Sequence, residues 1–202
     1  MTDHELLEQW RAGSERAGNE LFDRYFVSIR RFFRNKVSSA ADDLVQETFL
    51  ACVQGRNRLR DDQAFRRYIF GAAHNILRVH LRRLQNGRID FGTVSAHDIR
   101  PSPSAAVAQE ETRVAVLEAL RRIPLDYQVV LELFYWEEMP VADVAAIIEI
   151  PEGTAKTRLR RGRELFCREL AALTQGRLGT QASEDLAARI ATGRDVAPVK
   201  TS

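Results

Sequence analysis

The chain has 202 residues and a formal net charge of +2 at pH 7, with 45% hydrophobic and 29% charged residues. This balance is typical of a globular protein with enough apolar material for one large or two small domains. No apolar run approaches the ~18 residues of a membrane span, and the acidic start MTDHELLEQW lacks the pattern of a secretory signal, so we expect a cytoplasmic protein without membrane insertion.

Two amphipathic helices are predicted at the N-terminal end. Over residues 3–10, Leu6, Leu7 and Trp10 form one helical stripe that ends at Gly13. Over residues 15–36 the apolar positions form an unusually aromatic face, made of Leu21, Phe22, Tyr25, Phe26, Ile29, Phe32 and Phe33. We interpret these aromatic side chains as core.

A third helix, over about 40–53, has a distinctive polar side. Asp43, Gln46 and Glu47 stand at i, i+3 and i+4, so they share one face. Acid–base chemistry at this face would need a pocket and a perturbed environment, and no nearby partner supplies either. The pattern leaves two alternatives, a solvated acidic patch and a docking face for a basic partner protein.

The next helix, over 65–84, is basic on one side and follows a polar, arginine-rich loop at 55–63. Its predicted buried stripe consists of Phe65, Tyr68, Ile69, Ala72 and Ile76. The opposite face presents Arg67, Gly71, His74, Asn75, Arg78 and Arg82. Arginines can hold phosphates, while the imidazole and amide can stack on or hydrogen-bond to exposed base edges. This face therefore predicts contact with nucleic acid.

A stretch rich in Gly, Pro and Ser separates two domains. Residues 86–109 show neither helical nor strand periodicity, which indicates a flexible linker between a domain at 1–85 and a domain at 110–173. Two helices are expected at the start of the second domain. The first carries Val114, Leu117, Leu120 and Ile123 on one face, and the second carries Val129, Val130, Leu133 and Phe134.

The second domain ends in a helix-turn-helix pattern over 140–170. A short apolar helix is followed by Pro151 and Gly153, which indicate a turn, and then by a longer basic helix. In that helix the predicted buried stripe is Ala155, Leu159, Gly162, Phe166 and Leu170. Cationic side chains occupy the other side, as expected for a helix docked in the DNA major groove, although a solvated basic helix is the alternative. Residues 174–202 read as a flexible tail.

This organisation resembles the extracytoplasmic-function sigma factors, the small promoter-specificity subunits of bacterial RNA polymerase. The segment 42–49, DDLVQETF, is similar to the family's polymerase-binding motif. The segment 65–83 looks like the helix that recognises and melts the minus-ten element, and 150–159, IPEGTAKTRL, is similar to the motif that reads the minus-thirty-five element. The family's usual glycine in the second-domain turn is Glu149 here.

The resemblance implies an all-α fold of two small helical domains, the second a four-helix unit, and a role in promoter-specific transcription initiation. It assigns Asp43, Gln46 and Glu47 to the clamp coiled coil of the largest polymerase subunit, and the polymerase flap region as a second contact. It assigns the loop at 55–63 to capture of a flipped base. The residues implied at the minus-ten element are Arg67, His74, Asn75, Arg78, Arg82 and Arg83. Those implied at the minus-thirty-five element are Thr154, Lys156, Thr157, Arg158, Arg160 and Arg161. An anti-sigma factor is an implied partner beside core polymerase and promoter DNA.

Two competing hypotheses belong to other classes. A stand-alone helix-turn-helix regulator would bind duplex operator DNA tightly without polymerase. A metal-dependent nuclease would use Asp42, Asp43 and Glu47, with His74 as a further candidate, but no third metal ligand has suitable spacing. The cysteines, Cys52 and Cys167, stand alone without metal-ligand spacing, as buried thiols in a reducing cytosol do. We therefore expect no catalytic residues, no metal and no cofactor.

Overall fold

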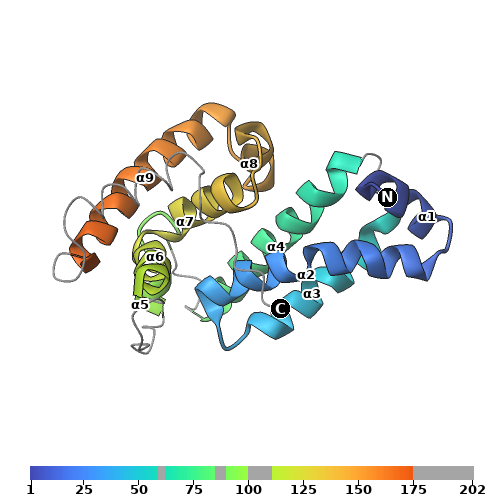
Figure 1. The fold of residues 1–202 in the computed structure, drawn as a ribbon, viewed down its shortest axis with the longest axis horizontal. Helices are drawn as coiled ribbons and strands as arrows, with labels where there is room; N and C mark the ends of the chain where they lie inside the picture. Colours follow the sequence, from blue (N-terminus) through green and yellow to red (C-terminus); the bar gives the residue numbers. More distant parts are fainter. Residues whose placement is uncertain (59–61, 85–89, 100–110, 175–202) are drawn as a thin grey trace. The chain divides into compact units, whose positions relative to one another are not determined.

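A computed structural model describes residues 1–58, 62–84, 90–99 and 111–174. Across these ranges the regular elements are helices, and the only β-type pairing is an isolated bridge between Ser95 and Pro124. The predicted all-α fold is confirmed. Two compact units make up the chain. The first holds Met1–Ile89 together with the short stretch Ala146–Glu149, and the second holds Asp90–Ala145 and Ile150–Ser202 (Figure 1). None of the helices described is long and apolar enough to cross a bilayer.

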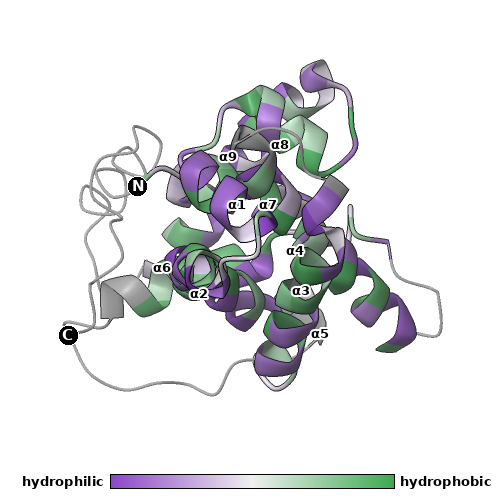
Figure 2. Cartoon of the chain, turned by 90° about the vertical axis from the view of Figure 1, so that its right-hand side faces the viewer, coloured by the Kyte–Doolittle hydropathy of each residue, from purple (hydrophilic) through white to green (hydrophobic). Residues whose placement is uncertain are grey.

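The first unit is a bundle in which α1 packs on α2 and α4, and α3 packs on both α2 and α4. Its elements are α1 (Asp3–Arg11), α2 (Glu15–Val37), α3 (Ala41–Gly55), the short 3₁₀ turn η1 (Arg56–Arg58) and α4 (Asp62–Leu84). Each helix carries hydrophilic and hydrophobic residues on the same ribbon, as amphipathic helices must if they share one core (Figure 2).

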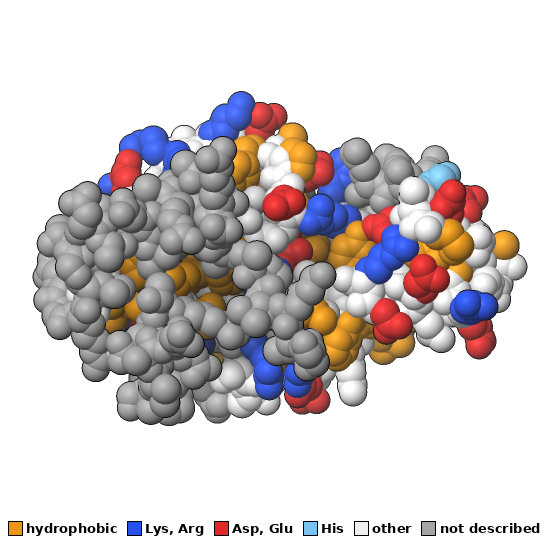
Figure 3. All heavy atoms as spheres, in the orientation of Figure 1, with side chains coloured by type: hydrophobic (Ala, Val, Ile, Leu, Met, Phe, Trp, Pro, Cys, Tyr) orange, Lys and Arg blue, Asp and Glu red, His pale blue; other side chains and the backbone are white. Residues whose placement is uncertain are grey.

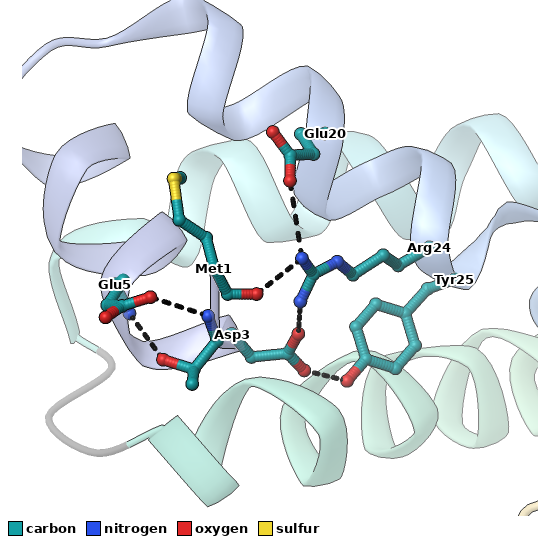
Figure 4. A network of polar contacts seen from close by, with 7 residues as sticks. Met1, Asp3, Glu5, Glu20, Arg24 and Tyr25 are labelled. Atoms are coloured by element: carbon teal, nitrogen blue, oxygen red, sulfur yellow. Dashed lines mark hydrogen bonds and ion pairs between the residues drawn. The ribbon is translucent and has the colours of Figure 1, made fainter.

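Helix α1 is fixed at its N-terminus by a capping box and by a polar network to α2 (Figure 4). The Thr2 hydroxyl accepts from the Glu5 backbone N–H at 3.3 Å, and the Glu5 carboxylate accepts from the Thr2 N–H at 2.7 Å. On α2, Arg24 donates to the Asp3 carboxylate at 2.8 Å and to the Met1 carbonyl at 2.6 Å, and the Tyr25 hydroxyl donates to Asp3. These bonds hold the buried stripe of α1 against α2.

The aromatic face predicted for α2 is core, with one exception. Tyr25, Phe32 and Phe33 are buried, and Tyr25 lies against Phe65 of α4 with ring centroids 5.5 Å apart. Phe26, in contrast, is 45% exposed, so its interpretation as a core residue was wrong. Its ring stacks on that of Phe49 of α3, with the ring centroids 6.2 Å apart, at the edge of the bundle. Helical periodicity does not predict how wide the buried arc of a helix is.

The second unit is built around α9, which packs on α6 and on α7. Its elements are α5 (Ala96–Ile99), α6 (Glu111–Arg122), α7 (Leu125–Leu131), the π-helical turn η2 (Glu132–Trp136), α8 (Val141–Ile147) and α9 (Glu152–Thr174). The stripe predicted for α9 is buried at every position. Glycine suits position 162 of this stripe because a Cβ there would come within 3.3 Å of both Tyr127 and Leu131 of α7.

The structure differs from two of the predictions for this unit. In α6, Val114 and Leu117 are only half-buried, and the core is formed by Val116, Ala119, Leu120 and Ile123. The segment after Ile123 does not continue as one α-helix, because α7 gives way to the wider π-helical turn at Glu132.

The linker predicted over 86–109 is not uniform. Residues 90–99 pack on the second unit: Leu125 N–H donates to the Val94 carbonyl at 3.0 Å, Asp126 N–H donates to the Phe91 carbonyl at 3.0 Å, and Phe91 is 8% exposed. His97 of α5 lies 2.7 Å from Glu118 of α6. The Gly/Pro/Ser composition does not predict this packing, because the packing depends on backbone hydrogen bonds and on the buried Phe91 ring. Residues 85–89 and 100–110, and the predicted tail beyond Thr174, lie outside the described residues.

Candidate nucleic-acid interface

The polar face of α3 is presented as the sequence predicted. Asp43, Gln46 and Glu47 are all exposed on one side of the helix, while Leu44, Val45 and Thr48 are buried behind them. The acidic residues in the first turn, Asp42 and Asp43, also suit the positive end of the helix dipole. The face is therefore a rigid array of three polar side chains.

Helix α3 is joined to its neighbours at the edge of this face. Arg30 of α2 donates to the Asp42 carboxylate at 2.9 Å, and this hydrogen bond holds the pKa of the Asp42 carboxyl below its usual value. On α4, burial lowers the pKa of the His80 imidazole, against the opposing effect of the Glu47 carboxylate. The hydrogen bond from Arg30 to Asp42 leaves Asp43 and Gln46 at the surface.

An exposed apolar strip continues the α3 face, and the sequence reading missed it. Leu50 is 56% exposed one turn after Gln46 and Glu47, and Val53 follows at 42%. Phe26 and Val27 of α2 are exposed as well. Hydrophobic periodicity treats such residues as core by default. The structure shows that all four side chains are exposed, on the same helix as the acidic face or on the neighbouring α2.

The basic side of α4 differs in part from the prediction. Asn75, Arg82 and Arg83 are exposed, Arg67 and Arg78 are half-buried, and a Cβ at Gly71 would meet open space. His74, however, is 4% exposed, so the prediction that it lies on the open face was wrong. The core stripe runs through Phe70, Ala73, Leu77 and Leu81 rather than Ala72 and Ile76, and His74 stands between Phe70 and Leu77 on that stripe.

The turn before α9 is a left-handed helix end. Glu149 has a φ of 58°, and the Ile150 N–H donates to the Ala145 carbonyl at 3.0 Å, which closes α8 as a Schellman motif does. Pro151 then starts α9, because its carbonyl accepts from the N–H groups of Thr154 and Ala155. Gly153 lies inside the first turn of α9, so the predicted turn position at Gly153 was wrong.

The exposed side of α9 carries cations that are paired with acidic residues of the same helix (Figure 3). Lys156 lies 2.7 Å from Glu152, and Glu164 accepts from Arg160 at 2.5 Å and from Arg161 at 3.2 Å. Thr154 is exposed on the same side. The Thr157 hydroxyl donates to the Gly153 carbonyl at 3.0 Å, which fixes its orientation on the helix.

Arg158 contacts another helix, whereas its basic neighbours pair within α9. It is half-buried and forms an ion pair with Asp126 of α7 at 2.9 Å, which ties α9 to the helix beneath it. No sequence pattern predicts this pair, because Asp126 is distant along the chain. Arg158 was predicted as a DNA contact, whereas its observed partner is structural.

Comparisons with known proteins match both units. A model described as sigma-70 region 2 matches residues 21–87, and one described as sigma-70, region 4 matches residues 113–166. The chain is 30% identical over 177 residues to the ECF RNA polymerase sigma factor SigM of Mycobacterium tuberculosis, covering 87% of this chain and 88% of the relative. It is 27% identical over 175 residues to the ECF RNA polymerase sigma-E factor of Escherichia coli, covering 81% and 92%.

A third relative and a solved structure agree with these matches. The RNA polymerase sigma-H factor of Pseudomonas aeruginosa is 27% identical over 184 residues, covering 85% of this chain and 95% of the relative. The structure of CnrH in complex with the cytosolic domain of CnrY superposes with a TM-score of 0.61 at 22% identity, covering 87% of this chain and 99% of that one. At this level of identity the superposition shows a shared fold.

Proposed function

The chain belongs to the extracytoplasmic-function sigma factors and directs transcription initiation, and from this premise we propose how its surfaces divide that work. The part at 1–85 binds core polymerase and the minus-ten element, and the part at 110–173 reads the minus-thirty-five element. The observation that carries the proposal is that two exposed polar arrays, on α3 and on α9, stand on different compact units. Each array sits on a helix whose opposite side is buried.

The α3 array is the proposed polymerase contact. Asp43, Gln46 and Glu47 would meet the clamp coiled coil of the largest subunit, and Leu50 with Phe26 would extend the contact with apolar area. Exposed apolar side chains beside a charged face are typical of a protein interface, because the apolar part supplies affinity and the charges supply orientation. The second unit would meet the polymerase flap region.

The basic side of α4 is the proposed minus-ten surface. The exposed residues on this side of α4 are Asn75, Arg82 and Arg83, and Arg67 and Arg78 are half-buried. The opposite side of the helix is buried. We leave His74 out because its side chain is in the core. The loop after α3 would receive an unstacked base. Melting then needs no chemical step, since preferential binding of single-stranded bases shifts the duplex toward the open form. The proposal is accordingly of a non-enzymatic subunit.

Helix α9 is the proposed minus-thirty-five reader. Thr154, Lys156, Thr157, Arg160 and Arg161 would contact bases or phosphates in the major groove. Phosphates would compete with Glu152 and Glu164 for the cations, so binding should fall steeply with salt. Arg158 would hold α9 on α7 and so set the angle at which the helix enters the groove.

The decisive experiment for the polymerase contact is promoter-specific transcription with core polymerase. The Glu47→Ala and Gln46→Ala variants should lose core affinity and specific transcripts together, while Asp23→Ala, an exposed acidic residue of α2, should keep both. If the unaltered chain neither binds core polymerase nor confers specific transcripts, the proposal fails.

A separate experiment addresses the reading helix. Lys156→Ala, Thr157→Ala and Arg161→Ala should impair promoter choice and leave core affinity intact. Arg168→Ala, an exposed arginine at the far end of α9, is the matched control and should change neither. Tight operator binding by the chain alone, with no dependence on polymerase, would favour the stand-alone regulator instead.

We also propose an anti-sigma protein as a regulatory partner. The support is the family membership and the solved relative CnrH, which is in complex with the cytosolic domain of CnrY. The α3 array and its apolar strip are the natural surface for such a protein, since covering them would also block polymerase. Purified partner should then compete with core polymerase for this chain, and simultaneous binding of both would contradict the assignment.

A further inference from the structure

A glycine in the middle of α4 has no packing reason within the fold. Gly71 lies well inside this helix, where glycine is less favourable than alanine because it loses more conformational freedom on folding. Among the residues that the structure describes, no atom lies within 4 Å of a Cβ built on Gly71. Its backbone is α-helical, a conformation that any residue with a side chain adopts. Neither crowding nor backbone geometry therefore requires glycine at this position.

Other helical glycines of the described chain have a reason that can be seen. A Cβ on Gly18 would come within 2.5 Å of the Trp10 ring, and one on Gly55 would overlap the Tyr68 hydroxyl. Gly153 also faces open space, but it lies in the first turn of α9, outside the helix interior in which glycine is unfavourable. Position 71 differs from these positions because only something outside the chain can use the space that its missing side chain leaves.

The open position lies at the centre of the proposed minus-ten surface. Arg67 stands one helical turn before Gly71, and Asn75 stands one turn after it, so all three share one face. The exposed Asn75 side chain is short, and its amide can reach the edge of a base only if the strand lies close to the helix. The longer arginine side chain can reach a phosphate from farther away. A side chain at position 71 would stand between the helix and a strand that lies close to it.

We propose that Gly71 is a specificity-determining residue of the minus-ten surface. Its missing side chain lets the sugar–phosphate backbone of a DNA single strand lie against α4, and a base of that strand comes within hydrogen-bonding reach of Asn75. Glycine is the usual residue where a ligand must approach a protein backbone closely. The inference rests on the proposed minus-ten function of α4, and it adds the residue that sets how near the strand can come.

The test uses the full chain with core polymerase on templates whose minus-ten region is already unpaired. Each non-template position is varied through all four bases, and the ratio of the best to the worst affinity is measured. Gly71→Ala should lower this ratio about fivefold at one position, the equivalent of one hydrogen bond, although its urea midpoint should equal or exceed that of the unaltered chain. Asn19→Ala is the matched control, because it replaces an exposed residue of α2 with the same strong helix former and should leave the ratio unchanged.

A double variant tests whether Gly71 acts through Asn75. Asn75→Ala should lower the ratio at the same template position, and adding Gly71→Ala to it should lower the ratio no further, because both substitutions remove one hydrogen bond. A further loss in the double variant overturns the inference, as does full discrimination by Gly71→Ala. A lower urea midpoint for Gly71→Ala would show that the glycine serves the fold instead. If the unaltered chain shows no base preference on these templates, the proposed minus-ten function fails as a whole.

Discussion

At the residue scale, the buried thiol of Cys52 makes a chemical prediction. Burial raises the pKa of Cys52 to about 12, and the side chain is fully buried in α3. The unfolded chain releases the thiol proton near a pKa of about 8.5, whereas the folded chain retains it, so rising alkalinity above that value favours unfolding. At pH 8 the native thiol should therefore resist alkylation and react only when the first unit unfolds.

The measurement is the rate of iodoacetamide labelling in a Cys167→Ser background. Cys167 is half-buried, and its pKa is raised by burial against the opposing effect of Arg163, so it would otherwise add a faster signal. Labelling of Cys52 should follow the unfolding rate through a urea series. Labelling that is fast and independent of urea would contradict the burial of this thiol.

Single residues also show where sequence reasoning reaches its limit. Five of the six positions implied for α9 lie on its exposed side, because its period of apolar residues is regular, and Arg158 is the half-buried exception. Arg158 and His74 were assigned to DNA all the same, since a helical wheel gives angles but not the width of the buried arc or the identity of a distant partner. Arg158 forms an ion pair with Asp126 of α7, and His74 is buried on the same stripe of α4 as Phe70 and Leu77.

At the element scale, the end of α8 holds a residue in a backbone conformation that favours glycine. Glu149 has a φ of 58° and an exposed side chain. A non-glycine residue in this region costs of order 1–3 kcal/mol, which the greater flexibility of glycine in the unfolded chain partly offsets. Glu149→Gly should therefore stabilise the folded chain by about 1 kcal/mol, measured as a higher urea midpoint. An unchanged or lower midpoint would show that Glu149 is not strained.

The ion pairs on α9 give a second prediction at this scale. Glu164 holds both Arg160 and Arg161, so in the proposed DNA complex the two arginines would exchange a carboxylate for a phosphate. Glu164→Gln removes that competition and should raise affinity for duplex DNA several-fold at low salt, with the gain shrinking as salt rises. Fluorescence anisotropy across a salt series measures it. Glu169→Gln on the same helix, whose partner is Arg168, is the control. Equal affinity of both variants would rule out the competition.

At the scale of the whole molecule, composition predicted two helical parts but misjudged the segment between them. A Gly/Pro/Ser-rich stretch was read as one linker, yet residues 90–99 pack on the second unit through Phe91 and two backbone hydrogen bonds. Backbone hydrogen bonds leave no pattern in an amino-acid sequence, and one aromatic residue in a polar stretch does not by itself predict a buried segment. Under the proposed function this packing would affect promoter binding, because the reach between the two proposed promoter contacts depends on how much of the chain between them stays attached to one unit.

Phe91→Ala tests this docking in the full chain. Removing a buried phenylalanine ring costs about 3 kcal/mol or more, and Phe91 is the one aromatic residue that residues 90–99 bury on the second unit. The amides of Leu125 and Asp126, which donate to Val94 and Phe91, should then exchange with deuterium about tenfold faster or more, while the amides in the middle of α9 keep their protection. Phe26→Ala, which removes an exposed ring from the other unit, should leave both sets unchanged. If Leu125 and Asp126 stay protected in Phe91→Ala, the segment is held by contacts other than this ring, and Phe91 is not its main anchor.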